Sequence, residues 1–241
     1  MGRLTLIRHG QSIWNLQNRF TGWIDVSLSA QGVKEAQQAA ALLRKQRFDL
    51  AFTSSLLRAQ DTLYEILRQN RHCNHYLRIH ETGREWYEHF KPTEEDESEL
   101  KIYVSEKLNE RYYGDLQGLN KDWARTHFGA EQVHLWRRSY DTPPPNGESL
   151  AMTAARALPY FQSHIVPPLQ RGEHVLVSAH GNSLRAIIMQ IEHMSAEQIL
   201  AYELKTGAPH IYEFDEHMQI LEKHILNQER FKKLNTLKQE A

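Results

Sequence analysis

Two stretches of this chain decide its fold: Leu4-Thr5-Leu6-Ile7-Arg8-His9-Gly10-Gln11-Ser12 near the start, and Val175-Leu176-Val177-Ser178-Ala179-His180-Gly181-Asn182-Ser183 far downstream. Each is a short apolar run that reaches a histidine and continues as His-Gly-x-Ser. Apolar runs of this length, stopped by glycine and cap-forming residues, are typical of buried parallel strands. Ligands of open α/β sheets bind beyond the carboxyl ends of the strands, so we expect His9 and His180 to face the same crevice.

Length and composition limit the class of protein. The chain has 241 residues and shows no linker, so we expect a single domain over residues 1–241. The only cysteine, Cys73, excludes an internal disulfide framework and favours a reducing, cytoplasmic location. No apolar stretch approaches the roughly 18 residues of a membrane span, and the first residues carry no secretory signal. These features predict a soluble protein without a membrane partner.

The charge pattern indicates an anionic small ligand. A net charge of −1 argues against nucleic acid as a partner, because a nucleic-acid-binding domain is strongly basic. Seven arginines lie next to glycines, turns or predicted strand ends instead of along one helical face: Arg8, Arg19, Arg58, Arg111, Arg137, Arg138 and Arg185. Their placement predicts a site that captures an anion.

The first half of the chain alternates strands and helices. We expect a loop lining the site over 14–26, a helix over 30–46 capped by Ser29, a strand over 49–53 and a helix over 56–69. The helix over 30–46 would turn Val33, Ala36, Ala40 and Leu43 inward. This alternation predicts a three-layer α/β fold, with a mainly parallel sheet flanked by helices. Residues 71–101, which contain the acidic run Glu94–Glu97, are interpreted as a surface insertion.

The second half continues the pattern. A helix capped by Asn120 is expected to run to about Phe128 and to be closed by Gly129, and a second helix takes in Val133–Arg138. A loop is expected over 142–147, and a helix over 148–170 that is kinked at Pro159. A further helix would follow His180, capped by Asn182 or Ser183. Residues 210–214 and 219–225 would form a hairpin or two short paired strands. We expect the tail over 227–241 to be mobile in the absence of ligand.

The candidate catalytic residues start with His9 and the arginine that precedes it in the sequence, Arg8. A neutral histidine beside positive charge can be a nucleophile toward phosphorus, and Arg8, Arg58 and His180 are candidates to hold the transferring group. Glu110, in a turn rich in glycine and tyrosine, is the best-placed carboxylate for general acid/base work. In isolation, His9 and His180 would be interpreted as structural residues, and Glu110-Arg111 as an exposed ion pair.

Six blocks of residues combine these features in order: Arg8-His9-Gly10; Asn15 with Phe20-Thr21-Gly22-Trp23; Glu110-Arg111-Tyr112-Tyr113-Gly114; Leu116-Gln117-Gly118-Leu119-Asn120-Lys121; Trp136-Arg137-Arg138; and Ala179-His180-Gly181-Asn182-Ser183-Leu184-Arg185. Together they resemble the cofactor-dependent phosphoglycerate mutases of the histidine phosphatase superfamily. The resemblance covers residues 4–225 apart from the insertion. Many family members carry glutamate where this chain has Gln11.

The resemblance implies an isomerase of glycolysis and gluconeogenesis that interconverts 3-phosphoglycerate and 2-phosphoglycerate. It implies that His9 is phosphorylated by 2,3-bisphosphoglycerate, that Glu110 moves a proton, and that Arg8, Arg58 and His180 hold the phosphoryl group. The substrate-binding residues that it implies are Ser12, Asn15, Thr21, Gly22, Arg58, Arg111, Tyr113, Lys121, Arg137, Arg138, Gly181 and Asn182. It implies no metal, and a homodimer is a further expectation.

Two other functions stay open at this point. A phosphatase of the same superfamily, acting on a small phosphorylated metabolite, would pass the phosphoryl group to water. Lys121, Arg137 and Arg138 favour the mutase, because a mutase must hold a second anionic group while its intermediate reorients. A non-catalytic phospholigand-binding or scaffold protein is the third possibility, and the intact frame around His9 argues against it.

Overall fold

A seven-stranded sheet forms the middle layer of the computed structural model, which describes residues 1–80, 93 and 99–226. Its strands are β1 (Gly2–Arg8), β2 (Leu50–Thr53), β3 (Tyr76–Ile79), β4 (Leu100–Val104), β5 (His174–Ala179), β6 (Pro209–Phe214) and β7 (Ile220–Ile225). Their order is β3-β4-β2-β5-β1-β6-β7. The first five strands in this order are parallel, and β6 and β7 add an antiparallel edge. The predicted fold class, a mainly parallel α/β sheet, is confirmed.

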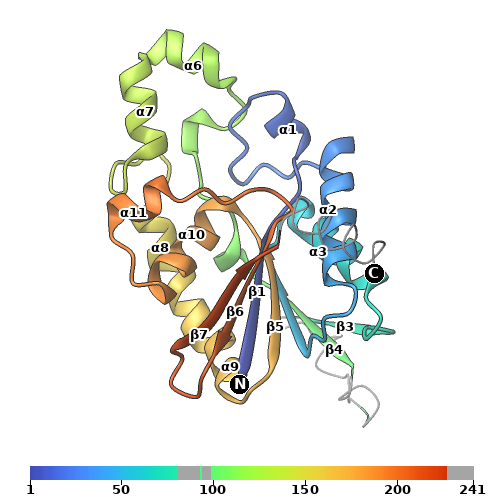
Figure 1. Ribbon diagram of the computed structural model, residues 1–241. Coiled ribbons are helices and arrows are strands. Elements are labelled where there is room, and N and C mark those ends of the chain that lie inside the picture. The colour runs from blue at the N-terminus through green and yellow to red at the C-terminus, as the bar shows by residue number, and fades with distance from the viewer. Residues whose placement is uncertain (81–92, 94–98, 227–241) are drawn as a thin grey trace, which may run out of the picture.

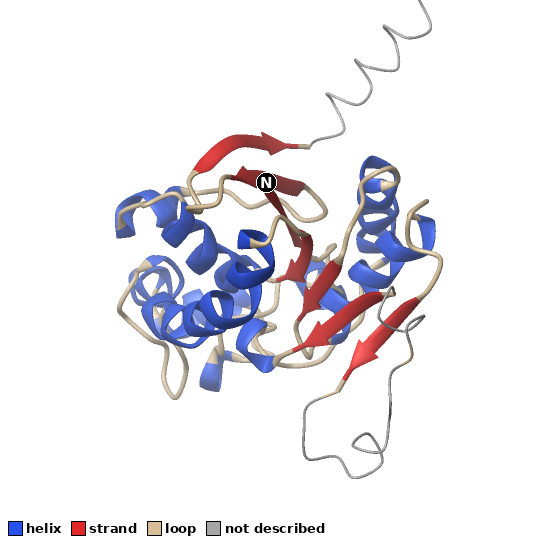
Figure 2. Ribbon diagram, turned by 90° about the horizontal axis from the view of Figure 1, so that it is seen from below, coloured by secondary structure: helices blue, strands red, loops and turns tan. Residues whose placement is uncertain are grey.

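Helices cover both faces of the sheet (Figures 1 and 2). One face carries α2 (Ala30–Leu43) and α3 (Leu57–Gln69). The other carries α8 (Leu150–Tyr160), a π-helical turn (Phe161–Ile165), α9 (Val166–Gln170), α10 (Gly181–Ile191) and α11 (Ala196–Ala201). The short helix α1 (Ile13–Leu16) and the pair α6 (Lys121–Phe128) and α7 (Ala130–Arg138) lie beyond the carboxyl ends of the parallel strands. Two 3₁₀ turns, Glu106–Leu108 and Gly114–Leu116, flank Glu110.

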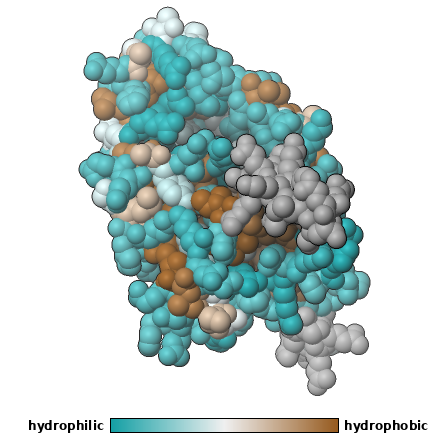
Figure 3. All heavy atoms as spheres, viewed as in Figure 1, coloured by the Kyte–Doolittle hydropathy of each residue, from teal (hydrophilic) through white to brown (hydrophobic). Residues whose placement is uncertain are grey.

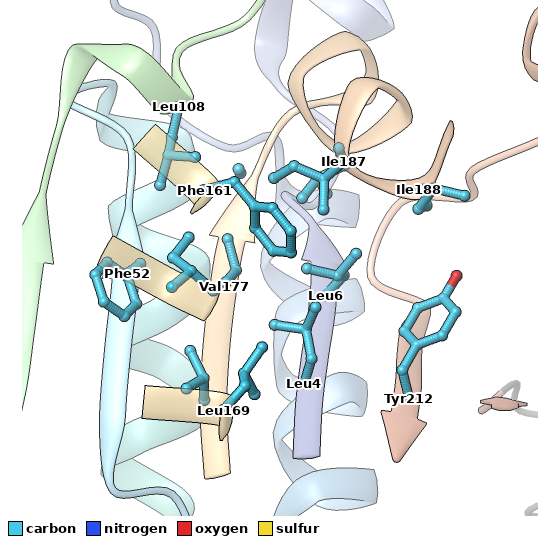
Figure 4. Close-up of a cluster of buried hydrophobic side chains, with 14 of the residues drawn as sticks. Leu4, Leu6, Phe52, Leu108, Phe161, Leu169, Val177, Ile187, Ile188 and Tyr212 are labelled. Atoms are coloured by element: carbon cyan, nitrogen blue, oxygen red, sulfur yellow. The ribbon is translucent and has the colours of Figure 1, made fainter. Parts of the chain in front are cut away.

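Side-chain alternation along the central strands supplies the two cores. Leu4, Leu6 and Val177 point to the face covered by α8 to α11, where they pack against Phe161 and Ile187 (Figure 4). Ile7 and Leu176 point to the opposite face and pack under α2 and α3. Successive residues of a strand face opposite sides of the sheet, so a nearly continuous apolar run fills both cores.

The outer surface in Figure 3 is largely hydrophilic, interrupted by hydrophobic patches. None of the helices in the described part of the chain combines the length and the apolar character needed to cross a membrane.

The register of the parallel strands places His9 and His180. Arg8 of β1 pairs with Ala179 of β5, so His9 and His180 leave neighbouring strand ends together. The His9 N–H donates to the Ala179 carbonyl oxygen at 3.0 Å. The ring centroids of the two histidines lie 4.9 Å apart, which confirms that they come together. His9 lines the pocket at these strand ends, but His180 is fully buried and does not face it, so the expectation of a crevice shared by both is only half correct.

The interpretation of 71–101 as a surface insertion is wrong where the structure describes it. Tyr76–Ile79 forms the edge strand β3, and Leu100 begins β4. The edge strand is half exposed, so its sequence lacks the continuous apolar run of a central strand. Glu94–Glu97 and the tail over 227–241 lie outside the described residues.

Several predicted boundaries are corrected. Within the expected loop over 14–26, Ile13–Leu16 is helical, because Ser12 and Asn15 form a capping box. Helix α2 is capped by Ser29 as predicted but ends at Leu43, and Val33 is exposed while Ala39 is buried. The predicted caps Asn182 and Ser183 lie inside α10, whose N-cap is His180 itself. The helix around Pro159 continues as a π-helical turn, and α11 was not predicted.

Replacing Gly32 in α2 is expected to change the free energy of unfolding in the direction opposite to that predicted from helix propensity. Helix propensity alone predicts that Gly32→Ala stabilises α2 by about 1 kcal/mol. A Cβ atom at Gly32 would instead collide with the backbone of Gln11, two residues after His9. We therefore expect the free energy of unfolding to fall by roughly 1–3 kcal/mol.

Urea unfolding of Gly32→Ala measures this change. The control is Lys34→Ala, at an exposed position of the same helix, which is expected to leave stability unchanged or slightly raised. A stabilised Gly32→Ala protein would contradict the predicted close approach of α2 to the loop that follows His9.

Candidate active site

His9 is a neutral imidazole with a defined tautomer. Its Nδ1 lies 2.6 Å from the Gly10 carbonyl oxygen, and its Nε2 lies 3.3 Å from the Arg58 Nε. A carbonyl can only accept a hydrogen bond and a guanidinium can only donate, so Nδ1 carries the proton and Nε2 keeps its lone pair. Burial, followed by the charges of Arg58 and Arg8, holds the pKa of His9 well below its usual range. Nε2 is therefore a ready nucleophile at neutral pH.

His180 lies behind His9 and is fully buried. Its Nε2 is 2.7 Å from the Ser54 hydroxyl oxygen, and that oxygen accepts the Leu56 N–H. The Ser54 hydroxyl hydrogen can then be donated to Nε2, which leaves the proton of the neutral ring on Nδ1. Burial, then the Arg58 charge, lowers the pKa of His180 well below its usual range. The ring is thus a neutral hydrogen-bond donor beside His9.

Arg58 places a fixed positive charge beside the His9 ring. It is 1% exposed, and its Nη1 and Nη2 donate to the carbonyl oxygens of Ile24 and Gly22. Burial lowers the pKa of Arg58 to about 10, so the side chain stays charged at neutral pH. Arg8 is held by the Leu204 carbonyl oxygen, which accepts from its Nη1 at 3.0 Å. Two guanidinium groups thus hold positive charge against a neutral imidazole.

Glu110 supplies a carboxylate to the lining of the same pocket. Its Oε1 accepts hydrogen bonds from the Arg111 N–H at 2.7 Å, the Asn182 Nδ2 at 2.7 Å and the Asn182 N–H at 3.2 Å. Burial alone would raise the pKa of Glu110, but the Arg111 N–H, the Arg8 charge and the Asn182 amide outweigh it and lower that pKa. Glu110 is therefore ionised and able to accept a proton.

A second group of cations clusters around Tyr113 and Phe20. Arg111 Nη2 donates to the Tyr113 hydroxyl and to the Arg137 carbonyl oxygen, both at 3.2 Å. Burial alone would raise the pKa of Tyr113, but the charge of Arg111 outweighs it and lowers that pKa. Lys121 and Arg137 reach the site from α6 and α7, and both lie within about 6.0 Å of the Phe20 ring. This group of cations can bind a second anionic group.

The pocket encloses about 160 Å³ and brings together most of the predicted site residues. Its lining comprises Arg8, His9, Asn15, Arg19, Phe20, Thr21, Gly22, Arg58, Glu110, Arg111, Tyr113, Lys121, Arg137, Arg138, Gly181, Asn182 and Arg185. All seven arginines singled out in the sequence are among them, so the lining holds eight cations with Lys121 and one carboxylate.

Two predicted residues do not line the pocket. His180 contacts His9 from behind, and the Ser12 hydroxyl caps α1 by accepting the Asn15 N–H. Sequence reasoning missed Ser54, the partner of His180. A signal for it existed: β2 ends at Thr53, one residue before Ser54, beside the His180 strand.

Four buried polar atoms around the site have no hydrogen-bond partner among the described residues: Arg8 Nε, Thr21 Oγ1, Arg111 Nε and His180 Nδ1. Buried donors are normally paired, so these atoms indicate a polyanionic ligand, which 2,3-bisphosphoglycerate fits by charge. No group of three or more His, Cys, Asp or Glu side chains that could hold a metal occurs within the part of the chain that the structure describes.

Comparisons with known proteins agree with this geometry. A model of the histidine phosphatase superfamily (branch 1) matches residues 4–98 and 87–226. The chain is 73% identical to a 2,3-bisphosphoglycerate-dependent phosphoglycerate mutase of Pseudoalteromonas atlantica, over 94% of this chain and 100% of the relative. It is 48% identical to the protein of that name from Parvibaculum lavamentivorans, over 92% and 95% of the two chains.

A solved structure shares the fold at low sequence identity. The mycobacterial glucosyl-3-phosphoglycerate phosphatase superposes with a TM-score of 0.71 at 23% identity, covering 93% of this chain and 97% of that one. The chain therefore belongs to the histidine phosphatase superfamily and, within it, to the 2,3-bisphosphoglycerate-dependent phosphoglycerate mutases.

Proposed function

We propose that this chain acts as a 2,3-bisphosphoglycerate-dependent phosphoglycerate mutase, an isomerase of glycolysis and gluconeogenesis that interconverts 3-phosphoglycerate and 2-phosphoglycerate through phospho-His9. The names of the relatives at 73% and 48% identity support the reaction. The single observation that carries the proposal is the neutral His9, with its Nε2 lone pair beside Arg58 in a small pocket lined by cations. A homodimer and a cytoplasmic location stay predictions.

His9 Nε2 attacks phosphorus, and the bond from phosphorus to the departing oxygen breaks as the N–P bond forms. The charge on the three equatorial oxygens is met by Arg58, Arg8 and the His180 Nδ1–H. These donors are in place before the reaction, so they cost little reorganisation at the transition state. When bound, 2,3-bisphosphoglycerate supplies the phosphoryl group that primes His9.

Glu110 moves the proton. As an ionised carboxylate it takes the proton from the substrate hydroxyl that attacks phospho-His9, and it returns the proton when the reaction runs in the other direction. Its Oε1 is occupied by the Arg111 and Asn182 donors, which leaves Oε2 for the hydroxyl. The base is thereby oriented as well as charged.

The outer cations favour a mutase over a phosphatase. A mutase must hold its bisphosphorylated intermediate while either phosphate is presented to His9, and this requires binding at both ends of the pocket. Arg111, Lys121, Arg137 and Arg138 line the pocket in addition to Arg8 and Arg58, and they supply positive charge for this second group. A phosphatase that acts on a small phosphorylated metabolite stays the alternative, with water as the phosphoryl acceptor.

Glu110→Gln keeps the size of the side chain and removes the base. We expect turnover to fall by ~10²–10⁴, while phosphoramidate still phosphorylates His9, because its ammonia leaving group needs no proton from Glu110. A coupled assay of 2-phosphoglycerate formation and intact-mass detection of the phosphoryl adduct measure the two effects. The matched control is Glu106→Gln, an exposed carboxylate in the same segment, with unchanged turnover expected. Full activity of Glu110→Gln would remove Glu110 from this role.

The ionisation of His9 is directly observable. Because its pKa is lowered, the ring should stay neutral, with the proton on Nδ1, as the pH falls through 6.5. Long-range ¹H–¹⁵N spectra of the imidazoles, recorded from pH 8 to pH 5 and assigned with His9→Gln, measure this. A His9 ring that titrates at about 6.5 would contradict the proposed resting state.

Cofactor stimulation separates the mutase from the phosphatase. Isomerisation of 3-phosphoglycerate should depend on added 2,3-bisphosphoglycerate, and His9→Ala should abolish both isomerisation and the phosphoryl adduct. Assays of isomerisation and of inorganic phosphate release, each with and without the bisphosphate, give the answer. Hydrolysis at a rate comparable to isomerisation, without stimulation, would favour the phosphatase.

A further inference from the structure

An arginine outside the pocket lining holds the segment that carries Glu110. Arg156 of α8 points its Nη1 at the carbonyl oxygens of Glu106, Lys107 and Asn109, at 3.3, 3.0 and 3.1 Å. Its Nη2 donates to the carbonyl oxygen of Glu110 itself at 3.0 Å. One guanidinium thus holds four of the five backbone carbonyl oxygens of residues 106–110, all except that of Leu108.

Glu148 orients this guanidinium. Its two carboxylate oxygens accept from Arg156 Nε at 2.9 Å and Nη2 at 2.8 Å, a bidentate pair. The two side chains are only 14% and 17% exposed. Glu148 Oε2 also accepts the Tyr112 N–H at 2.9 Å. Arg156 and Glu148 together therefore hydrogen-bond to the backbone before and after Arg111.

The same pair reaches the loop that binds Arg58. The Trp23 ring lies 5.3 Å from the Arg156 guanidinium, and its Nε1 donates to the Glu110 carbonyl oxygen at 2.5 Å. The neighbouring Gly22 carbonyl oxygen accepts from Arg58 Nη2. Both lone pairs of the Glu110 carbonyl are therefore used, one by Trp23 and one by Arg156.

We propose that Arg156, oriented by Glu148, is a positioning residue that sets where the Glu110 carboxylate stands relative to the substrate hydroxyl. The inference rests on the acid/base role of Glu110 proposed above. Proton transfer needs heavy-atom distances of about 2.6–3.2 Å, so a small displacement of the Glu110 backbone slows it steeply. Arg156 is not among the residues that line the pocket, so its replacement leaves the other donors of the lining in the sequence.

Arg156→Lys tests the geometry while keeping the charge. A lysine ammonium is a point donor and cannot span four carbonyl oxygens and a carboxylate. We expect kcat for isomerisation to fall by roughly 10- to 100-fold, with KM for 3-phosphoglycerate within twofold of the unsubstituted protein. Met152→Ala, at an exposed position of the same helix, is the control and should leave kcat unchanged. A rise in KM with unchanged kcat would overturn the proposal.

The decisive measurement combines Arg156→Lys with Glu110→Gln. A residue that acts through Glu110 has nothing to position once the carboxylate is gone, so Arg156→Lys should cause no further loss in the Glu110→Gln protein. The same fold-loss in both proteins would overturn the inference. Full activity of Glu110→Gln alone would instead show that the acid/base proposal is the one that fails.

A second readout separates positioning from general distortion. Phosphorylation of His9 by phosphoramidate does not use Glu110, so Arg156→Lys should leave its rate unchanged, and a fall equal to the fall in kcat would overturn the inference. If urea titrations show that the Arg156→Lys protein is not folded, the same three measurements are made on Glu148→Gln: kcat and KM, the combination with Glu110→Gln, and phosphorylation of His9 by phosphoramidate. It keeps an acceptor for the Tyr112 N–H and removes the charge that orients Arg156.

Discussion

The structure depends on the in-register parallel pairing of β1 with β5. Because Arg8 lies opposite Ala179, the residues that follow leave the sheet side by side, and the imidazoles of His9 and His180 come into contact. The pairing of β2 with β5 adds Ser54, which hydrogen-bonds to His180. A shift of one residue in this register would turn one histidine to the other face of the sheet and separate the pair.

Around this pair the protein gathers positive charge at an energetic cost. Eight cations line a pocket with one carboxylate, and Arg58 is almost completely buried. Charges of one sign repel each other in a small volume, so carbonyl oxygens from distant loops hold them: Gly22 and Ile24 for Arg58, Leu204 for Arg8. Burial, and after it the charges of Arg58 and Arg8, lower the pKa of His9 and favour the neutral form of its ring. Mutual repulsion in the free site is thus part of what a polyanionic substrate relieves.

Prediction from sequence succeeded where the signal is local. The apolar runs before His9 and His180, the Ser29 and Asn120 caps and the hairpin of β6 and β7 each depend on neighbouring residues. It failed at Tyr76–Ile79, because an edge strand is recognised by its partner β4 and carries little apolar pattern of its own. Val33 fits a helical stripe but is exposed, because the sheet covers a face that includes Ala39 instead.

The sequence by itself determined the fold class, the two strand-end histidines, the arginines that line one pocket and, through six ordered blocks, the family. These follow from local periodicity and from residue types that the chemistry requires. Only the tertiary structure decided the tautomer of His9 and the hydrogen bond between Ser54 and His180. It also decided that Arg156, paired with Glu148, donates to the backbone of Glu110. Each of these is a hydrogen bond whose acceptor or donor is set by backbone geometry, often between segments far apart in the chain. A local sequence pattern does not specify which donor and acceptor atoms will come within hydrogen-bonding distance of each other.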